Sequence, residues 1–334
     1  MTDAAGSPSP PGGGKKNWKT ALQKSGLPLE HSVAGVLKRL GLKVQVEYSY
    51  LRRNERSEDI TFSVDLRAVH RDDEKGLVLS LLVECKYRTR GTQWIFVPNE
   101  DEAPFNQHLP TYFKGIDLFT QSSVSTLGAY DLYPQELMVH RGLQLAEAGN
   151  VAPKGPNEAA AQLRYASLEQ SLEWTVQRVS DVKHFGADLP RLPAVGVCLI
   201  VTTAELRVLK PQLTLEAFEA ARHPDEVSVP QPYVFLDAPP DGAFQRHATR
   251  RIQEELSDAA LVAQGFGDVL EPLRASSAVT DLNSFILGES RLEPRVFVVV
   301  QYRALEEVIA QILKDSERLH ILDKAATWEI DRRK

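Results

Sequence analysis

Two acidic side chains and one lysine stand inside apolar, strand-like segments, where a charge is costly unless it is paired or bound to a metal. Glu84 and Lys86 end an apolar run that begins at Leu77, and Asp65 interrupts the alternating run Ile60–Val69. Side chains in a strand alternate between two faces, so Glu84 and Lys86 should share one face. Carboxylates suit Mg²⁺ or Mn²⁺, and a lysine beside such an ion can position or deprotonate a water molecule. These residue types predict metal-assisted hydrolysis.

The polar stretch His70–Gly76 turns the chain between the two strands that carry these residues. If the strands pair as a hairpin, Asp65 lies opposite Glu84 or one pair away, within reach of a shared cation. Strand alternation turns Cys85 toward the other face, where we expect a core side chain rather than a ligand.

An acid separated by one residue from a lysine is a common pattern, and the chain contains it more than once. Asp73-Glu74-Lys75 stands in a polar turn and Asp181-Val182-Lys183 at the end of a helical pattern. Glu84 and Lys86 alone have strand context, with buried neighbours expected on both sides. The alternative is that these two residues form a structural contact at a strand end, with Asp65 at its rim.

The hydrophobic pattern around these residues predicts a helix, three strands, a helix and a strand. The expected elements are a helix from about Pro28 to Gly41, strands Lys43–Leu51, Ile60–Val69 and Leu77–Arg88, a helix from about Glu158 to Val182, and a buried strand Val195–Thr203. Between Thr89 and about Asn157 the pattern is irregular. The short strands there, Trp94–Val97 and Glu136–His140, are expected in an insertion outside the core layer.

The pattern divides the chain into three parts. Residues 1–16 are expected to be a disordered tail, because Ala, Gly, Ser and Pro dominate there. Residues 17–205 should form the α/β core with its insertion at about 89–157, and residues 206–334 a C-terminal α/β extension, separate or within the same domain. The extension's expected elements are a helix Leu213–Ala221, a strand Tyr233–Leu236, a helix Phe244–Ala263, a strand Arg295–Tyr302 and a helix Leu305–Leu319. The last strand either joins the core sheet or makes a dimer contact, so a homodimer stays open.

Composition limits the class of protein more than its chemistry. A chain of 334 residues with 43% hydrophobic positions can bury a substantial core. Its longest apolar runs, Val195–Val201 and Val296–Val300, are far shorter than the ~20 residues of a membrane span. Without an apolar signal core we expect a cytoplasmic protein that does not act in a membrane. Cys85 and Cys198 stand in strand-like runs, which indicates buried thiols rather than disulfides or a zinc site.

The net charge of −6 is unevenly distributed, because residues 1–56 carry ten Lys and Arg against four Asp and Glu. One basic face could therefore meet phosphates while the whole chain stays acidic. A solvated lysine-rich surface explains the same bias, so charge does not decide the function.

The whole constellation resembles the PD-(D/E)XK superfamily of restriction-endonuclease-like nucleases: a helix that carries an acid, a strand aspartate, a hairpin, Glu-x-Lys, and then a helix–strand pair. The resemblance covers about residues 28–204 and implies an αβββαβ core, a mixed central sheet flanked by helices, with the acids at a cleft. Val64 stands where the motif name has proline. Gln162-Leu163-Arg164-Tyr165 resembles the glutamine-and-tyrosine helix of RecB-like members, with a different spacing.

Position by position, the resemblance implies that Asp65, Glu84 and the Cys85 backbone carbonyl hold one Mg²⁺ or Mn²⁺ ion. Lys86 would orient the attacking water or stabilise the developing charge. Glu30 matches a first-helix glutamate that many members add to the metal site. The implied activity is phosphodiester hydrolysis, with DNA as the expected partner and an endonuclease favoured over an exonuclease.

Beyond the motif, Arg88 and Arg90 share the parity of Lys86 and could hold flanking phosphates, with Trp94 available to stack a base. An ordinary basic strand end beside a partly buried tryptophan explains these three residues equally well. We find neither a phosphate-binding P-loop nor a dinucleotide fingerprint nor a G-x-S-x-G elbow in the sequence.

Two other functions stay open at the level of sequence. The same fold could be catalytically inactive and act as a nucleic-acid-binding or assembly module, its acids being structural. A metal-dependent hydrolase of small phosphates is the second, and it would show no affinity for polynucleotides.

Overall fold

A computed structural model of the chain describes residues 17–53, 58–72, 76–99, 112–116, 137–145, 151–152, 155–185, 192–269, 294–317 and 319. The expected tail, residues 1–16, lies outside these ranges. The helices are α1 (Asn17–Lys24), α2 (Leu27–Arg39), α4 (Pro156–Phe185), α5 (Leu215–Ala220), α6 (Pro224–Val227), α7 (Gly242–Leu256), α8 (Asp258–Ala263) and α11 (Leu305–Ser316). The strands are β1 (Lys43–Arg53), β2 (Asp59–Asp72), β3 (Leu77–Lys86), β4 (Gln93–Pro98), β5 (Lys114–Gly115), β6 (Met138–Leu145), β7 (Val151–Ala152), β8 (Ala194–Thr202), β9 (Glu205–Leu209), β10 (Ser228–Gln231), β11 (Tyr233–Asp237) and β12 (Val296–Gln301).

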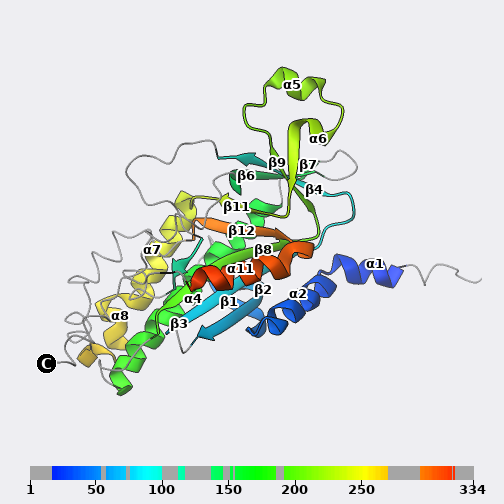
Figure 1. Cartoon of the computed structure of the whole chain (residues 1–334). Coiled ribbons are helices and arrows are strands. Elements are labelled where there is room, and N and C mark those ends of the chain that lie inside the picture. The colour runs from blue at the N-terminus through cyan, green and yellow to red at the C-terminus, as the bar shows by residue number, and fades with distance from the viewer. Residues whose placement is uncertain are drawn as a thin grey trace, which may run out of the picture.

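The described strands form one mixed sheet in the order β1-β2-β3-β8-β12-β11-β6-β4-β9-β10, with β5 added to β8 and β7 to β6 (Figure 1). The pairs β1–β2 and β2–β3 are antiparallel, whereas β3–β8 and β8–β12 are parallel. The centre of the sheet reads as unbroken apolar sequence because both of its faces are covered: every residue of β8 and of β12 is buried.

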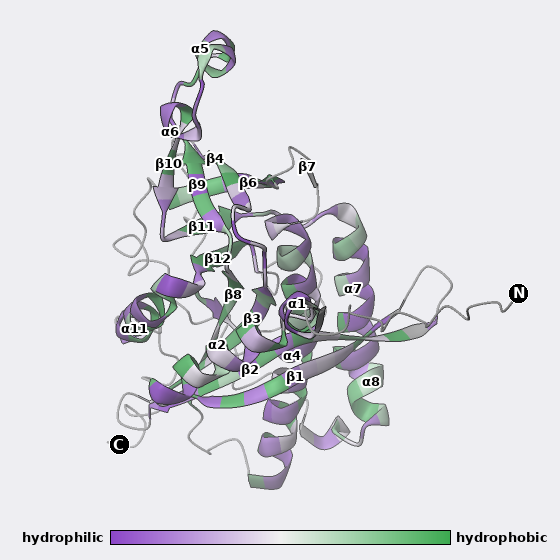
Figure 2. Ribbon diagram, turned by 90° about the vertical axis from the view of Figure 1, so that its right-hand side faces the viewer, coloured by the Kyte–Doolittle hydropathy of each residue, from purple (hydrophilic) through white to green (hydrophobic). Residues whose placement is uncertain are grey.

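Helices cover both faces of the sheet, so the fold is a mixed α/β structure. On one face, the apolar residues of α4, α7 and α8 pack in one core cluster with those of β4, β9 and alternate positions of β8. On the other face, α2 and α11 pack over the opposite positions of β3, β8 and β12. Figure 2 shows α11 and α4 on opposite sides of these three strands. No described helix combines the length and the apolar character that a membrane crossing would require.

The core elements follow the sequence pattern closely. Helix α2 begins beside Pro28, which suits a first helical position, and the chain leaves it through Gly41 at φ 84°. The expected helix at Phe244–Ala263 is in fact two helices, α7 and α8. They separate at Ser257, whose hydroxyl accepts a hydrogen bond from the Ala260 N–H and so caps the second helix.

The short strands expected outside the core layer belong to the sheet instead. Strand β4 pairs with β6 and with β9, and its alternate residues Trp94 and Phe96 have no exposed surface. Their ring area is large enough to make them core residues, although the sequence around them is irregular. The C-terminal strand β12 lies between β8 and β11, so part of the expected extension completes the same sheet.

The segment between β9 and β10 projects from the body of the molecule with α5 and α6 (Figure 1). The sequence predicted a helix in this region but neither strand. The base of the projection is held by Arg207, which is 4% exposed and forms ion pairs with Glu205 and Asp225.

Candidate active site

Strands β2 and β3 form the expected antiparallel hairpin, and their ladder ends at the pair Leu66–Val83. The next residue on each strand is Asp65 and Glu84, so the two acids meet where the strands stop pairing. Asp65 Oδ2 accepts a hydrogen bond from the Cys85 N–H at 2.5 Å. The hairpin thus brings the two predicted acids together.

Asp65 stands at a change of face in β2. Leu66 packs with the α2 and α11 side of the core and Val64 with the α4 side, although side chains two residues apart in a strand normally share a face. Beside it in β1, Glu47 adopts φ 58°, a left-handed conformation that is uncommon outside glycine. Glu47 and Asp65 are not paired in the ladder between β1 and β2, whereas the pairs on each side of them, Val46–Leu66 and Tyr48–Val64, are. This local twist releases the Asp65 carboxylate from the sheet and lets it reach β3.

Glu84 and Lys86 share one face of β3, as the strand period predicts. The Lys86 Nζ donates to Glu84 Oε1 at 2.5 Å and to the side-chain Oε1 of Gln162 at 3.1 Å. Glu84 is only 3% exposed, and its Oε2 has no hydrogen-bond partner among the described residues. A buried carboxylate oxygen without a partner is costly, and a cation would satisfy it.

Cys85 points into the opposite core, as expected, and packs with the cluster under α2 and α11. Burial raises the pKa of its thiol well above the usual value, so the sulfur stays protonated. The N–H and C=O of one strand residue point to the same side. Because the Cys85 N–H meets Asp65, its carbonyl faces the same edge and is available as an oxygen ligand there.

Burial and mutual repulsion raise the pKa of both acids. The pKa of Glu84 rises to about 7, through desolvation first and the Asp65 charge second, while Lys86 opposes the rise. Desolvation also raises the pKa of Asp65 against the opposing effects of the Cys85 N–H and Lys86. Two buried carboxylates and one lysine leave a local excess of negative charge, which favours a bound cation.

Glu30 lies in the first turn of α2 and is half-buried. Its pKa is raised by desolvation, then by the charges of Asp65 and Glu47, and lowered by Lys86. Glu30 is therefore within electrostatic range of Asp65 and Lys86, and its carboxylate lies at the positive end of the helix dipole. We call Glu30, Asp65, Glu84, Lys86 and Gln162 the carboxylate–lysine cluster.

The residues of this cluster fit a hard divalent ion by their chemistry, although none of the described His, Cys, Asp or Glu side chains gather in a group of three or more that could hold a metal. The fit depends on the unpartnered Oε2 of Glu84, on Asp65 and on the Cys85 carbonyl.

Arg88, Arg90 and Trp94, which the sequence suggested as nucleic-acid contacts, do not all lie on an open surface. Trp94 is fully buried, and its indole N–H donates to Gln144 Oε1 at 3.1 Å. Neither face of its ring is open to a base, which corrects that expectation. Arg88 is partly buried: its Nε donates to the same Gln144 oxygen at 2.6 Å, and its guanidinium lies 5.7 Å from the Trp94 ring centroid. Arg90 is exposed in the turn after β3.

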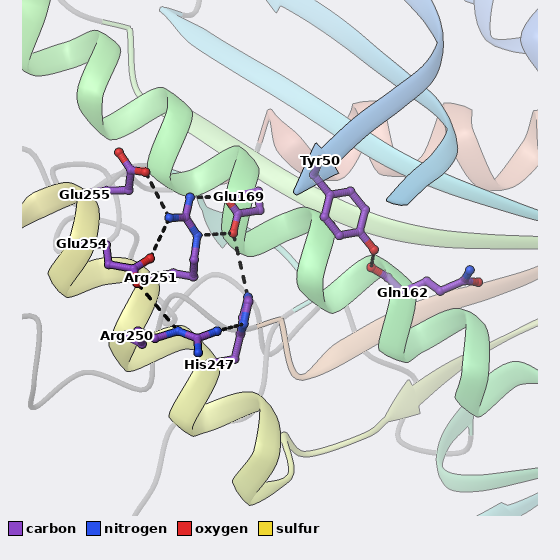
Figure 3. Close-up of polar contacts among 8 residues, drawn as sticks. All are labelled: Tyr50, Gln162, Glu169, His247, Arg250, Arg251, Glu254 and Glu255. Carbon is purple, nitrogen blue, oxygen red and sulfur yellow. Dashed lines mark hydrogen bonds and ion pairs between the residues drawn. The ribbon is translucent and has the colours of Figure 1, made fainter. Parts of the chain in front are cut away.

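Tyr50 is a site residue that the sequence pattern did not single out. Its hydroxyl donates to the backbone carbonyl of Gln162 at 3.2 Å, which joins β1 to α4 (Figure 3). The side chain of the same Gln162 accepts from Lys86. Burial raises the pKa of Tyr50, so the hydroxyl remains a donor. The alternation of Tyr48 and Tyr50 with exposed residues in β1 was the available signal, because it marks both rings as buried.

Comparison with known proteins gives no relatives: no family model matches the chain, and neither a curated protein nor a solved structure matches it.

Proposed function

We propose that this protein is a metal-dependent nuclease of the PD-(D/E)XK type that hydrolyses phosphodiester bonds in DNA. The single observation that carries the proposal is the meeting of Asp65 and Glu84 at the open end of the β2–β3 hairpin, with Lys86 on the same face as Glu84. The order α2, β1, β2, β3, α4, β8 around that meeting point supports it, because it is the order that the resemblance implies, with β4 to β7 added between β3 and α4.

A Mg²⁺ ion held by Asp65, Glu84 and the Cys85 carbonyl, with Glu30 as a further candidate ligand, would lower the pKa of a bound water and neutralise phosphate charge. Lys86 is positioned by Gln162 Oε1, so its ammonium stays in the cluster when Glu84 engages a cation. From there it can hold the attacking water or stabilise charge on the phosphate. Tyr50 fixes the α4 backbone at Gln162 and thereby the position of the lysine's second partner.

Incubation of the purified chain with circular single-stranded DNA, circular duplex DNA and RNA, each with Mg²⁺ and with EDTA, tests the activity. We expect Mg²⁺-dependent cutting of circular DNA, since an endonuclease needs no free end. Asp65→Asn and Glu84→Gln should abolish it without loss of folding. Absence of cutting on all three substrates would contradict the proposal.

An inactive nucleic-acid-binding module remains the second candidate. The observation in its favour is that Lys86 already neutralises Glu84 Oε1 without any ion. This candidate predicts salt-dependent DNA binding that is unaffected by Mg²⁺ and no product in any of the three reactions.

A further inference from the structure

Helix α7 has one buried face and one polar face. Phe244, Ala248 and Ile252 are buried in the core cluster that α7 shares with α4. The other face borders a surface depression of about 410 Å³. We call its lining residues the α7 polar face: Gly242, Gln245, Arg246, Thr249, Arg250 and Gln253. This lining contains two arginines, amide and hydroxyl groups, and no acid.

The two arginines of the α7 polar face keep much of their binding capacity. Arg246 is exposed, and its side chain makes no hydrogen bond or ion pair within the described part of the chain. Arg250 lies at the edge of the face: its Nη2 contacts His247 Nδ1 at 3.3 Å, and its Nε lies 3.9 Å from Glu254 Oε1. An ion pair that long contributes little, and although Nε itself is buried, Nη1 of Arg250 is left available.

The neighbouring Arg251 shows the contrast (Figure 3). It binds both carboxylate oxygens of Glu169 on α4, each at 2.9 Å, and also contacts Glu254 and Glu255. Arg251 therefore fastens α7 to α4, whereas Arg246 and Arg250 face outward. The helix separates its structural arginine from the exposed Arg246 and the partly exposed Arg250.

Side-chain contacts lead from the α7 polar face across α4 to Arg52 in β1. Arg250 contacts His247, and the His247 ring lies 5.0 Å from the ring of Tyr165 on α4. The guanidinium of Arg52 lies 3.9 Å from the Tyr165 ring centroid. Arg52 is two residues from Tyr50, which bonds the backbone of Gln162 beside Lys86. Burial and the surrounding arginines lower the pKa of His247 to about 4, so at neutral pH the imidazole is uncharged and Nδ1 can accept from Arg250.

We propose that Arg52, Arg246 and Arg250 form a phosphate-binding track that holds the backbone of a polynucleotide on the α7 side of the cleavage site. The inference rests on the proposed function and adds to it the surface that holds the DNA backbone, namely the α7 polar face together with Arg52. Guanidinium groups with neighbouring amides and hydroxyls are the usual partners of nucleic-acid phosphates. The α7 polar face from Gly242 to Gln253 rises about 16 Å, the axial length of roughly five phosphates of one duplex strand.

Binding without cleavage isolates this track. The full chain in EDTA is titrated into a fluorescein-labelled oligodeoxynucleotide, single-stranded and duplex in separate arms, and anisotropy is followed over a series of salt concentrations. Arg246→Ala with Arg250→Ala should weaken binding several-fold and make the slope of log affinity against log salt shallower by ~1 for each phosphate that is no longer bound. Arg246→Lys keeps the charge and should retain most of the affinity.

Two controls make the result specific. Arg303→Ala removes an exposed arginine beside α11, on the other side of the sheet, and should change neither affinity nor slope. The single variant Arg246→Ala removes a side chain that has no described hydrogen bond or ion pair, so its effect cannot come from damage to a structural interaction. Circular dichroism confirms that each variant is folded.

The possible results distinguish a failure of the phosphate-binding track from a failure of the proposed nuclease activity. Equal slopes for wild type and the double variant overturn the track, even if wild type cuts circular DNA in Mg²⁺. If the arginine variants also cleave a minimal ester such as bis(p-nitrophenyl) phosphate at the wild-type rate while binding DNA less tightly, the track is supported. If wild type neither binds an oligonucleotide nor cuts any substrate, both proposals fall.

Discussion

Glu84 is the side chain around which the chemistry of the site is arranged. It is almost fully buried, one oxygen is bound by Lys86, and the other has no partner in the described structure. A buried carboxylate oxygen without a partner is destabilising for folding, and under the proposed function a bound cation would compensate for it. Lys86 is held by two partners and is therefore oriented before any substrate arrives.

Replacement of Lys86 tests its chemical role. Lys86→Met keeps the length of the side chain and removes the ammonium, so we expect DNA cleavage to fall by at least ~10²-fold, as for loss of a group that acts on a proton or a developing charge. DNA binding in EDTA should stay within a few-fold of wild type. Cleavage rates of circular DNA provide the measurement.

Lys183→Met is the matched control for that variant. Lys183 stands in the other acid-x-Lys pattern of the described chain, at the end of α4, where its Nζ bonds the Gly265 carbonyl. Its loss should leave cleavage unchanged. Equal losses in the two variants would mean that the effect of Lys86→Met is one of stability.

In the proposed reaction we expect Gln162 to act only through the lysine. Gln162→Ala removes the second partner of Lys86 Nζ but no charge, so we expect a smaller fall in cleavage than for Lys86→Met. A positioning role also predicts partial rescue by Gln162→Asn or Gln162→Glu, which keep an oxygen acceptor. If Gln162→Ala cuts at the wild-type rate, the hydrogen bond is structural.

At the scale of the element, the twist in β1 and β2 is what releases Asp65 from the sheet. The twist holds Glu47 in a left-handed backbone conformation, which costs a residue with a Cβ roughly 1–2 kcal/mol relative to glycine. Glu47→Gly should therefore be more stable than Glu47→Ala by about 1 kcal/mol, although glycine normally weakens a strand. Urea unfolding of the two variants measures the difference, and a more stable alanine variant would contradict the strained backbone.

The polar turn His70–Gly76 indicated the hairpin, and strand period two predicted the shared face of Glu84 and Lys86 and the core direction of Cys85. Sequence reasoning did not reach the face change at Asp65. That change depends on a single residue, Glu47, in a conformation that its type does not favour. It also treated Trp94 as partly exposed, because nothing in the sequence shows that β9 and β6 flank β4 in the sheet.

At the scale of the whole molecule, one sheet connects segments that the sequence pattern kept apart. Local periodicity predicts a strand at Arg295–Tyr302 but carries no information on its neighbours. Pairing with β8 on one side and β11 on the other arises only from tertiary packing. The carboxylate–lysine cluster lies at one end of this sheet's core strands, so its energetics are part of the stability of the molecule as a whole.

The stability of the molecule should consequently depend on pH through Glu84. Its pKa rises from 4.5 when unfolded to about 7 in the fold, a difference of roughly 3 kcal/mol. The protonated form favours the fold, so this contribution is fully present below pH 4.5 and is lost as the pH rises through about 7. Glu84→Gln, uncharged at every pH, should lose less stability than wild type over that interval. Thermal unfolding of both proteins at a series of pH values measures the difference, and parallel curves would contradict the raised pKa.

At neutral pH, binding of Mg²⁺ should restore the free energy of unfolding that is lost when the buried carboxylates ionise. A ligand that binds only the folded chain stabilises it by ~2.7 kcal/mol at a hundredfold excess over its dissociation constant, which raises the melting temperature of a chain this size by a few degrees. We expect that rise for wild type at pH above the pKa of Glu84 and a smaller one below it, where protons compete with the ion for the same oxygens. Asp65→Asn and Glu84→Gln should show no rise, while Lys183→Met should behave as wild type. An equal rise in all four proteins would place the ion elsewhere on the molecule and remove the physical basis for a metal at the hairpin.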